Sequence, residues 1–87
     1  MAYRVIWKPE ALVEIDDLPK QISDRITKKV ETYLALNPRQ LGEAMLGGFS
    51  GLYRYRIGDY RVIYDIHDET ITIHMVRVGH RKNVYED

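Results

Sequence analysis

The sequence predicts a small α+β domain in which two helices pack on a mainly antiparallel sheet of about four strands. Two observations carry this prediction. Apolar residues recur every three to four positions between residues 9 and 37, as in amphipathic helices, whereas residues 52–78 alternate apolar and polar side chains, as in strands. The chain has 87 residues, the size of one domain, and we expect residues 1–87 to form it.

The N-terminal part is expected to contain one strand and a helical hairpin. Residues 3–7 are rich in β-branched and aromatic side chains, which favours a strand. Pro9 suits the first turn of a helix that Pro19 ends, and a second helix is expected from Gln21 to about Asn37. The apolar stripe of this second helix consists of Ile22, Ile26, Val30, Tyr33 and Leu34. The short connection between the two helices makes them antiparallel.

A loop is expected from residue 38 to residue 51, and it ends in the glycine-rich segment 47–51. A phosphate-binding loop would need a lysine and a helix after the glycines, but a strand follows here. We therefore interpret the segment as a flexible connector.

Three strands are expected in the remainder, at residues 52–57, 60–67 and 70–78. The dipeptide Gly58-Asp59 places glycine at the first central position of a two-residue turn, which is typical of a type II′ hairpin. Asp68-Glu69 forms a weaker second turn. These turns predict an antiparallel meander.

This register predicts two different faces of the sheet, because side chains alternate along a strand. The face covered by the helices is expected to carry Tyr53, Tyr55, Ile57, Tyr60, Val62, Tyr64, Ile66, Ile71, Ile73 and Met75. The opposite face is expected to carry Leu52, Arg54, Arg56, Arg61, Ile63, Asp65, Thr72, His74, Val76 and Val78. Arg56 and Arg61 then become cross-strand neighbours, although like charges in that position cost about 0.2–1 kcal/mol.

The arginines on this face point to an anion site. The chain has 13 basic and 13 acidic residues, and a formal net charge of zero argues against a general nucleic-acid coat protein. Arg54, Arg56 and Arg61 nevertheless gather on one face, and guanidinium groups bind phosphate through paired hydrogen bonds. The alternative is that they extend into solvent or pair with Asp65 and the acidic C-terminal residues.

No cofactor and no bound metal are expected. The chain has no cysteine, and His67, His74 and His80 lack the spacing of metal ligands. No stretch is long and apolar enough to span a membrane, and charged residues interrupt the only apolar run near the N-terminus. We therefore expect a cytoplasmic protein without a membrane partner.

Three blocks of sequence resemble the RelE/ParE superfamily of type II toxins, and within it the RelE-like messenger-RNA interferases. The blocks are Gly51–Arg56, Gly58–Tyr64 and Val78–Tyr85. The resemblance implies a RelE-like fold and a metal-independent endoribonuclease. In this family the 2′-hydroxyl of a message in the ribosomal A site attacks the adjacent phosphate.

The resemblance also implies roles for individual residues. Arg61 and Arg81 match arginines that act on the phosphate, with Arg81 as the candidate acid. Tyr85 matches a C-terminal tyrosine that orients or activates the 2′-hydroxyl. Arg54 and Arg56 stand where other members carry lysine, so they can stabilise charge but are poor bases. The implied catalytic residues are Arg56, Arg61, Arg81 and Tyr85. The implied substrate-binding residues are Arg54, Arg77, His80 and Lys82.

The resemblance further implies a RelB-like antitoxin as partner, with messenger RNA on the ribosome as substrate. Contact with operator DNA would be indirect, through the antitoxin. Two alternatives remain open. One is a ParE-like inhibitor of DNA gyrase, which needs no catalytic arginines. The other is a binding module with weakened catalysis, which the missing lysines favour.

Overall fold

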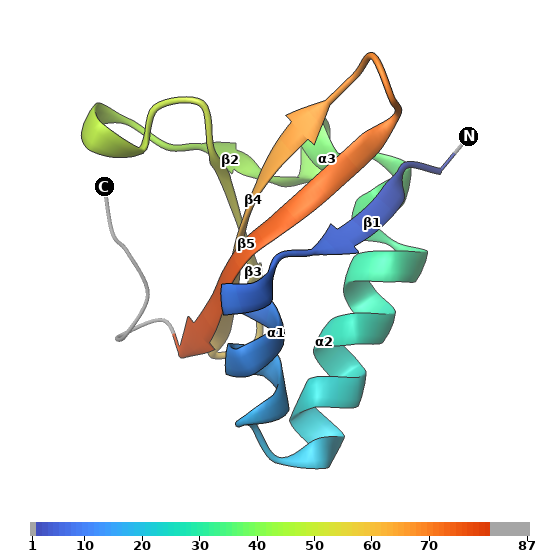
Figure 1. The fold of residues 1–87 in the computed structure, drawn as a ribbon, viewed down its shortest axis with the longest axis vertical. Helices are drawn as coiled ribbons and strands as arrows, with labels where there is room; N and C mark the ends of the chain where they lie inside the picture. Colours follow the sequence, from blue (N-terminus) through green and yellow to red (C-terminus); the bar gives the residue numbers. More distant parts are fainter. Residues whose placement is uncertain (1, 81–87) are drawn as a thin grey trace.

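The computed structural model describes residues 2–80 and is built around a five-stranded sheet (Figure 1). The elements in chain order are β1 (Arg4–Trp7), α1 (Pro9–Asp16), α2 (Lys20–Thr32), the 3₁₀ turn η1 (Leu34–Leu36), α3 (Pro38–Leu41), β2 (Glu43–Ala44), the 3₁₀ turn η2 (Gly47–Phe49), β3 (Tyr53–Ile57), β4 (Tyr60–His67) and β5 (Thr72–His80). The strand order is β1-β5-β4-β3-β2, with β1 parallel to β5 and every other pair antiparallel. The predicted α+β class is therefore confirmed.

One strand more is present than the sequence predicts. Glu43 and Ala44 pair with Arg54 and Tyr53 of β3, which makes β2 an edge strand of two residues. Such a short strand lacks the run of alternating residues by which strands are recognised. Its position matters because it extends the sheet beside the arginines of β3.

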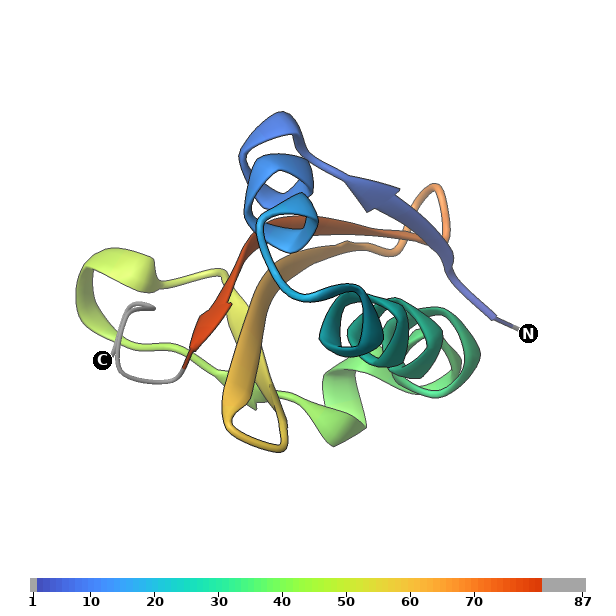
Figure 2. The same cartoon turned by 90° about the horizontal axis from the view of Figure 1, so that it is seen from below.

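The two long helices cover one face of the sheet and share a core with it. Figure 2 shows α1 close to β5, and α2 on the side of the sheet away from the segment that joins β2 to β3. The buried residues of this core are Ala11, Ile15, Ile26, Val30, Leu34, Ala35, Ile57, Val62, Tyr64, Ile73, Met75 and Val78. Burial of their apolar surface is the main force that holds the helices on the strands. No helix in the described range 2–80 is long and apolar enough to cross a membrane.

The second helix is shorter than predicted. It ends at Thr32, and the chain then tightens into η1 before Pro38 begins α3. Leu34 and Ala35 are both buried in η1, and the carbonyl of Ala35 accepts a hydrogen bond of 2.8 Å from the N–H of Tyr3. The prediction of one helix to Asn37 is wrong because this contact with Tyr3, the residue before β1, is not visible in the helical period.

The first hairpin has the predicted register. Ile57 pairs with Tyr60 and Arg56 with Arg61. Gly58 has a φ of 60°, whereas Asp59 has no positive φ, as a type II′ turn requires.

The second turn differs from the prediction. It spans residues 68–71, and β5 begins at Thr72. Ile71 has a φ of 49° and is 40% exposed, so it does not belong to the core face. Its carbonyl instead accepts a hydrogen bond of 2.9 Å from the N–H of Arg4, which connects the turn to β1.

A β-bulge also changes the predicted faces. Ile63 pairs with Arg77 but Tyr64 pairs with Met75, so Val76 is an extra residue in β5. Beyond the bulge the alternation is inverted, and Val78 lies in the core at 1% exposure, not on the opposite face. An extra residue of this kind has no sequence mark in this strand, which contains no glycine before Gly79.

The face opposite the helices has a small apolar cluster of its own. Met45 and Ile63 are buried there, and Phe49, Leu52 and Val76 pack against them. The segment between β2 and β3 therefore folds over the sheet, and the interpretation as a mere connector is wrong.

The hydroxyl of Tyr64 joins the sheet to α3. It donates a hydrogen bond of 2.6 Å to the carbonyl of Pro38, and burial raises the pKa of this fully buried phenol. A Cβ at position 42 would overlap the same hydroxyl, so Gly42 is required by close packing. This contact orients the chain as it enters β2.

Candidate anion-binding site

Three arginines and one glutamate line a shallow cavity of about 60 Å³ on the face opposite the helices. Arg54 and Arg56 come from β3, Arg61 from β4 and Glu43 from β2. The structure thus brings together the three arginines that the sequence predicted for one anion site. Neighbouring strands lie about 4.8 Å apart, so one phosphate group can contact side chains from β3 and β4 together.

The strand register explains the arrangement. Arg56 stands directly opposite Arg61, and Arg54 stands opposite Glu43. Nε of Arg54 lies 3.8 Å from Oε1 of Glu43, which offsets part of the positive charge. Arg54 and Arg61 are half-buried, and Nη1 of Arg61 is fully buried, whereas Arg56 is exposed. Arg61 is therefore more enclosed by the protein than Arg56.

Glu43 is the residue of the cavity that the sequence did not reveal. It lies 11 positions before Arg54 in a segment that reads as a loop, and only the pairing of β2 with β3 places it here. A carboxylate among arginines can hold them in place, compete with a phosphate or accept a proton. The cavity can therefore bind an anion and also move a proton.

Arg77, predicted to bind substrate, is engaged elsewhere. Its Nε lies 3.0 Å from each carboxylate oxygen of Glu14, and its Nη2 lies 2.7 Å from Oε2. The N–H of Val78 also donates to Oε1 of Glu14 at 2.8 Å. The pairing of β1 with β5 ends at Met75. Beyond that point Glu14 on α1 accepts the hydrogen bond from the backbone N–H of Val78 that a neighbouring strand would otherwise accept. The ion pair connects the helix layer to the sheet.

The pKa of Glu14 reflects two opposing causes. Burial of the carboxyl group raises it, but the hydrogen bonds from Arg77 and from the N–H of Val78 lower it, and the net direction is down. Glu14 therefore stabilises the folded chain in its charged form.

His80 contacts a core-side residue. It is paired with Tyr60 across β4 and β5, and their rings meet edge-on with centroids 5.5 Å apart. His80 does not line the cavity of the three arginines. The predicted residues Arg81, Lys82 and Tyr85 lie outside the described residues.

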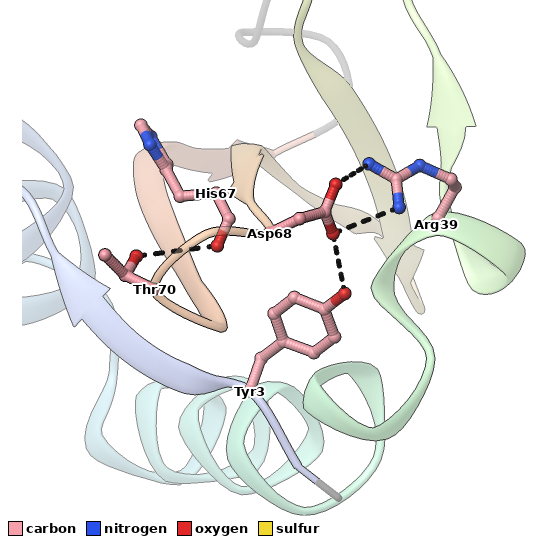
Figure 3. A network of polar contacts seen from close by, with 5 residues as sticks. All are labelled: Tyr3, Arg39, His67, Asp68 and Thr70. Carbon is pink, nitrogen blue, oxygen red and sulfur yellow. Dashed lines mark hydrogen bonds and ion pairs between the residues drawn. The ribbon is translucent and has the colours of Figure 1, made fainter.

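A second polar network secures the turn between β4 and β5 (Figure 3). The guanidinium of Arg39 donates to both carboxylate oxygens of Asp68, at 2.9 and 3.3 Å, and the hydroxyl of Tyr3 donates to the same group at 2.8 Å. These hydrogen bonds lower the pKa of Asp68, and the bond to Asp68 together with burial raises the pKa of Tyr3. The network ties the turn to α3 and to the residue before β1.

The sequence and the fold are those of a known class of small proteins. Residues 5–85 match the family model described as the ParE toxin of type II toxin–antitoxin systems, parDE. The chain therefore belongs to this family and is a type II toxin of the RelE/ParE superfamily.

Among individual relatives, two come from Mycobacterium tuberculosis. The protein named Toxin RelG is 29% identical over 85 residues, which cover 98% of each chain. The protein named Toxin RelE is 30% identical over 83 residues, which cover 95% of this chain and 86% of that protein.

Solved structures agree with the fold. The toxin–antitoxin complex RelBE2 of M. tuberculosis contains a chain that superposes with a TM-score of 0.90 at 28% identity, with 95% of both chains covered. The isolated RelE toxin of Escherichia coli superposes with a TM-score of 0.74 at 24% identity, over 91% of this chain and 84% of that one. At that identity the second likeness concerns the fold alone.

Proposed function

We propose that this toxin is a ribosome-dependent endoribonuclease that cleaves messenger RNA in the A site, and that an antitoxin restrains it. The observation that carries the proposal is the cavity of Arg54, Arg56 and Arg61, with Glu43 at its edge. Relatives named RelE and the complexes of RelB with RelE support the same reading. The substrate is ribosome-bound, so the toxin would act in the cytoplasm.

Cleavage by the 2′-hydroxyl consists of three changes. The 2′-oxygen attacks the adjacent phosphorus and loses its proton, the bond from phosphorus to the 5′-oxygen breaks, and that oxygen gains a proton. The products are a 2′,3′-cyclic phosphate and a 5′-hydroxyl. Arg54, Arg56 and Arg61 would stabilise the additional negative charge on the phosphorane, because cationic groups gathered around the reacting phosphate lower the energy of that charge. Arg81 would protonate the leaving oxygen.

Glu43 and Tyr85 are the candidates for the proton acceptor. An arginine cannot take this role, because it stays protonated at any useful pH. Glu43 is the one carboxylate among the described residues that line the cavity, and its Oε1 lies 3.8 Å from Nε of Arg54. We therefore assign proton removal to Glu43 and substrate orientation to Tyr85.

Glu43→Gln is expected to lower the single-turnover cleavage rate by about 100-fold or more, because general-base catalysis contributes roughly 10²–10⁴. The rate is measured on programmed ribosomes with saturating toxin, and binding of toxin to ribosomes is recorded separately. Glu31→Gln removes a carboxylate from α2 on the other face and is the matched control. If Glu43→Gln leaves the rate unchanged and Tyr85→Phe abolishes it, the acceptor is Tyr85.

The second candidate function is inhibition of DNA gyrase. It is favoured by one observation, namely that the matching family model is that of a ParE toxin. Inhibition by binding would need no proton acceptor and no attacking hydroxyl.

One pair of assays separates the two functions. The toxin is added to a cell-free translation reaction and the message is mapped by primer extension, while a parallel reaction measures supercoiling by purified gyrase. We expect cuts that depend on ribosomes, fall within codons and carry cyclic phosphate ends, with supercoiling unaffected. Intact message together with lost supercoiling would establish the gyrase reading. Neither effect from a folded chain would identify a binding module without catalysis.

A further inference from the structure

A second group of side chains with ligand chemistry lies away from the arginine cavity, and it is independent of the proposed nuclease. Asp65 and His67 of β4 and His74 of β5 each offer one donor atom, and these atoms all lie within 4.8 Å of one another. Nε2 of His67 is 3.0 Å from Oδ1 of Asp65. The two imidazole rings stack with centroids 4.2 Å apart and an angle of 27° between their planes.

The sheet register brings the three residues together. Asp65 is directly opposite His74, and His67 is two residues after Asp65 and therefore on the same face. His67 and His74 are seven positions apart in the sequence, which does not match a local metal motif. Sequence spacing alone did not indicate this group, because antiparallel pairing of β4 with β5 sets the distance between His67 and His74.

The donor set suits zinc. Two imidazole nitrogens and one carboxylate oxygen are a common three-ligand zinc set, with metal–ligand distances of about 2.0–2.2 Å. Donor atoms around a tetrahedral zinc ion are then roughly 3.3–3.5 Å apart, a value that follows from those bond lengths. The donor atoms here lie within 4.8 Å of one another, so binding would draw them together by rotation of the side chains. The side chain of His67 is 46% exposed, so it has room to rotate.

The neighbouring polar network leaves these donors available. Figure 3 shows the ring of His67 directed away from the carboxylate of Asp68, which Arg39 and Tyr3 occupy. The alternative is that His67 and Asp65 form an ordinary surface ion pair, which needs no third residue. It does not account for the second imidazole, stacked on the first and within reach of the same carboxylate.

We propose that Asp65, His67 and His74 form a binding site for one divalent transition-metal ion with a preference for nitrogen ligands, of which Zn²⁺ is the probe. The ion would cross-link β4 and β5 at the end of the sheet nearest the turn 68–71. A fourth coordination position would remain for water or for a group from another molecule.

The test is a zinc titration of the full chain, made without a histidine tag by chemical synthesis and refolding and stripped with a chelator. Isothermal calorimetry should give one equivalent of Zn²⁺ bound, and thermal unfolding should shift upward by several degrees at saturating zinc. Co²⁺ in place of Zn²⁺ should give visible absorption bands of a four- or five-coordinate site. Mg²⁺ should have no effect, since it prefers oxygen ligands.

Matched variants decide the location of the site. His67→Ala, His74→Ala and Asp65→Asn should each weaken zinc binding at least tenfold, whereas His80→Ala should leave the affinity unchanged. Circular dichroism of the metal-free variants checks that each one folds. Absence of saturable binding at 100 µM zinc, or an equal loss in His80→Ala, would overturn the proposal. So would full affinity in His74→Ala, which would leave only the ion pair of Asp65 and His67.

Discussion

Arg61→Ala should slow cleavage of translated message by about 100- to 1,000-fold, which corresponds to roughly 3–4 kcal/mol of lost transition-state stabilisation. Arg61 is half-buried, its Nη1 is fully buried, and it lies opposite Arg56 in the cavity. A partly enclosed guanidinium loses less freedom than an exposed one when it contacts the phosphorane. Arg56→Ala should cost less than Arg61→Ala, because the exposed side chain of Arg56 is replaced more easily by water.

Single-turnover cleavage on programmed ribosomes is the measurement, with the binding of toxin to ribosomes recorded separately. Arg25→Ala is the matched control, because Arg25 is an exposed arginine on α2 that does not line the cavity. Equal rates for Arg61→Ala and the wild type would contradict the assignment of the cavity. Loss of ribosome binding with an unchanged rate on bound ribosomes would mean that Arg61 holds substrate and does not act on the reacting phosphate.

Arg77→Ala should lower the free energy of unfolding by about 2 kcal/mol and leave the cleavage rate of the folded protein unchanged. The substitution removes three contacts of 3.0 Å or less and leaves Glu14, 27% exposed, without its ion pair. Removing one partner of such a pair costs more than the pair contributes, because the other charge remains partly buried. Urea unfolding at pH 7 measures the effect. If Arg77→Ala unfolds like the wild type but cleaves more slowly, Arg77 binds substrate instead.

The same ion pair predicts a pH dependence of stability. The pKa of Glu14 is lowered in the folded chain relative to its ordinary value of 4.5, so its contribution is complete above that value. It is lost as the pH falls through the lowered pKa of the folded state. Glu14→Gln should therefore show a flatter loss of stability below about pH 4.5 than the wild type. Part of the slope should remain, because the pKa of Asp68 is lowered as well, by Arg39 and Tyr3.

The local sequence was sufficient to predict the α+β class, the register of the first hairpin and the shared face of the three arginines. The type II′ turn at Gly58-Asp59 sets the register of β3 and β4, and that register alone places Arg56 opposite Arg61. Alternation along the strands then predicts that Arg54 shares their face. These features depend on residues close in the sequence, so the sequence by itself determined them.

Contacts between distant segments decided the rest. The two-residue strand β2 places Glu43 in the cavity, and the position of α1 at the edge of β5 pairs Glu14 with Arg77. The bulge at Val76 inverted the faces beyond it, and cross-strand pairing joined His74 to Asp65 and His67. Each outcome depends on which elements pack side by side, and that is determined by burial of the whole core and not by any local pattern of residues.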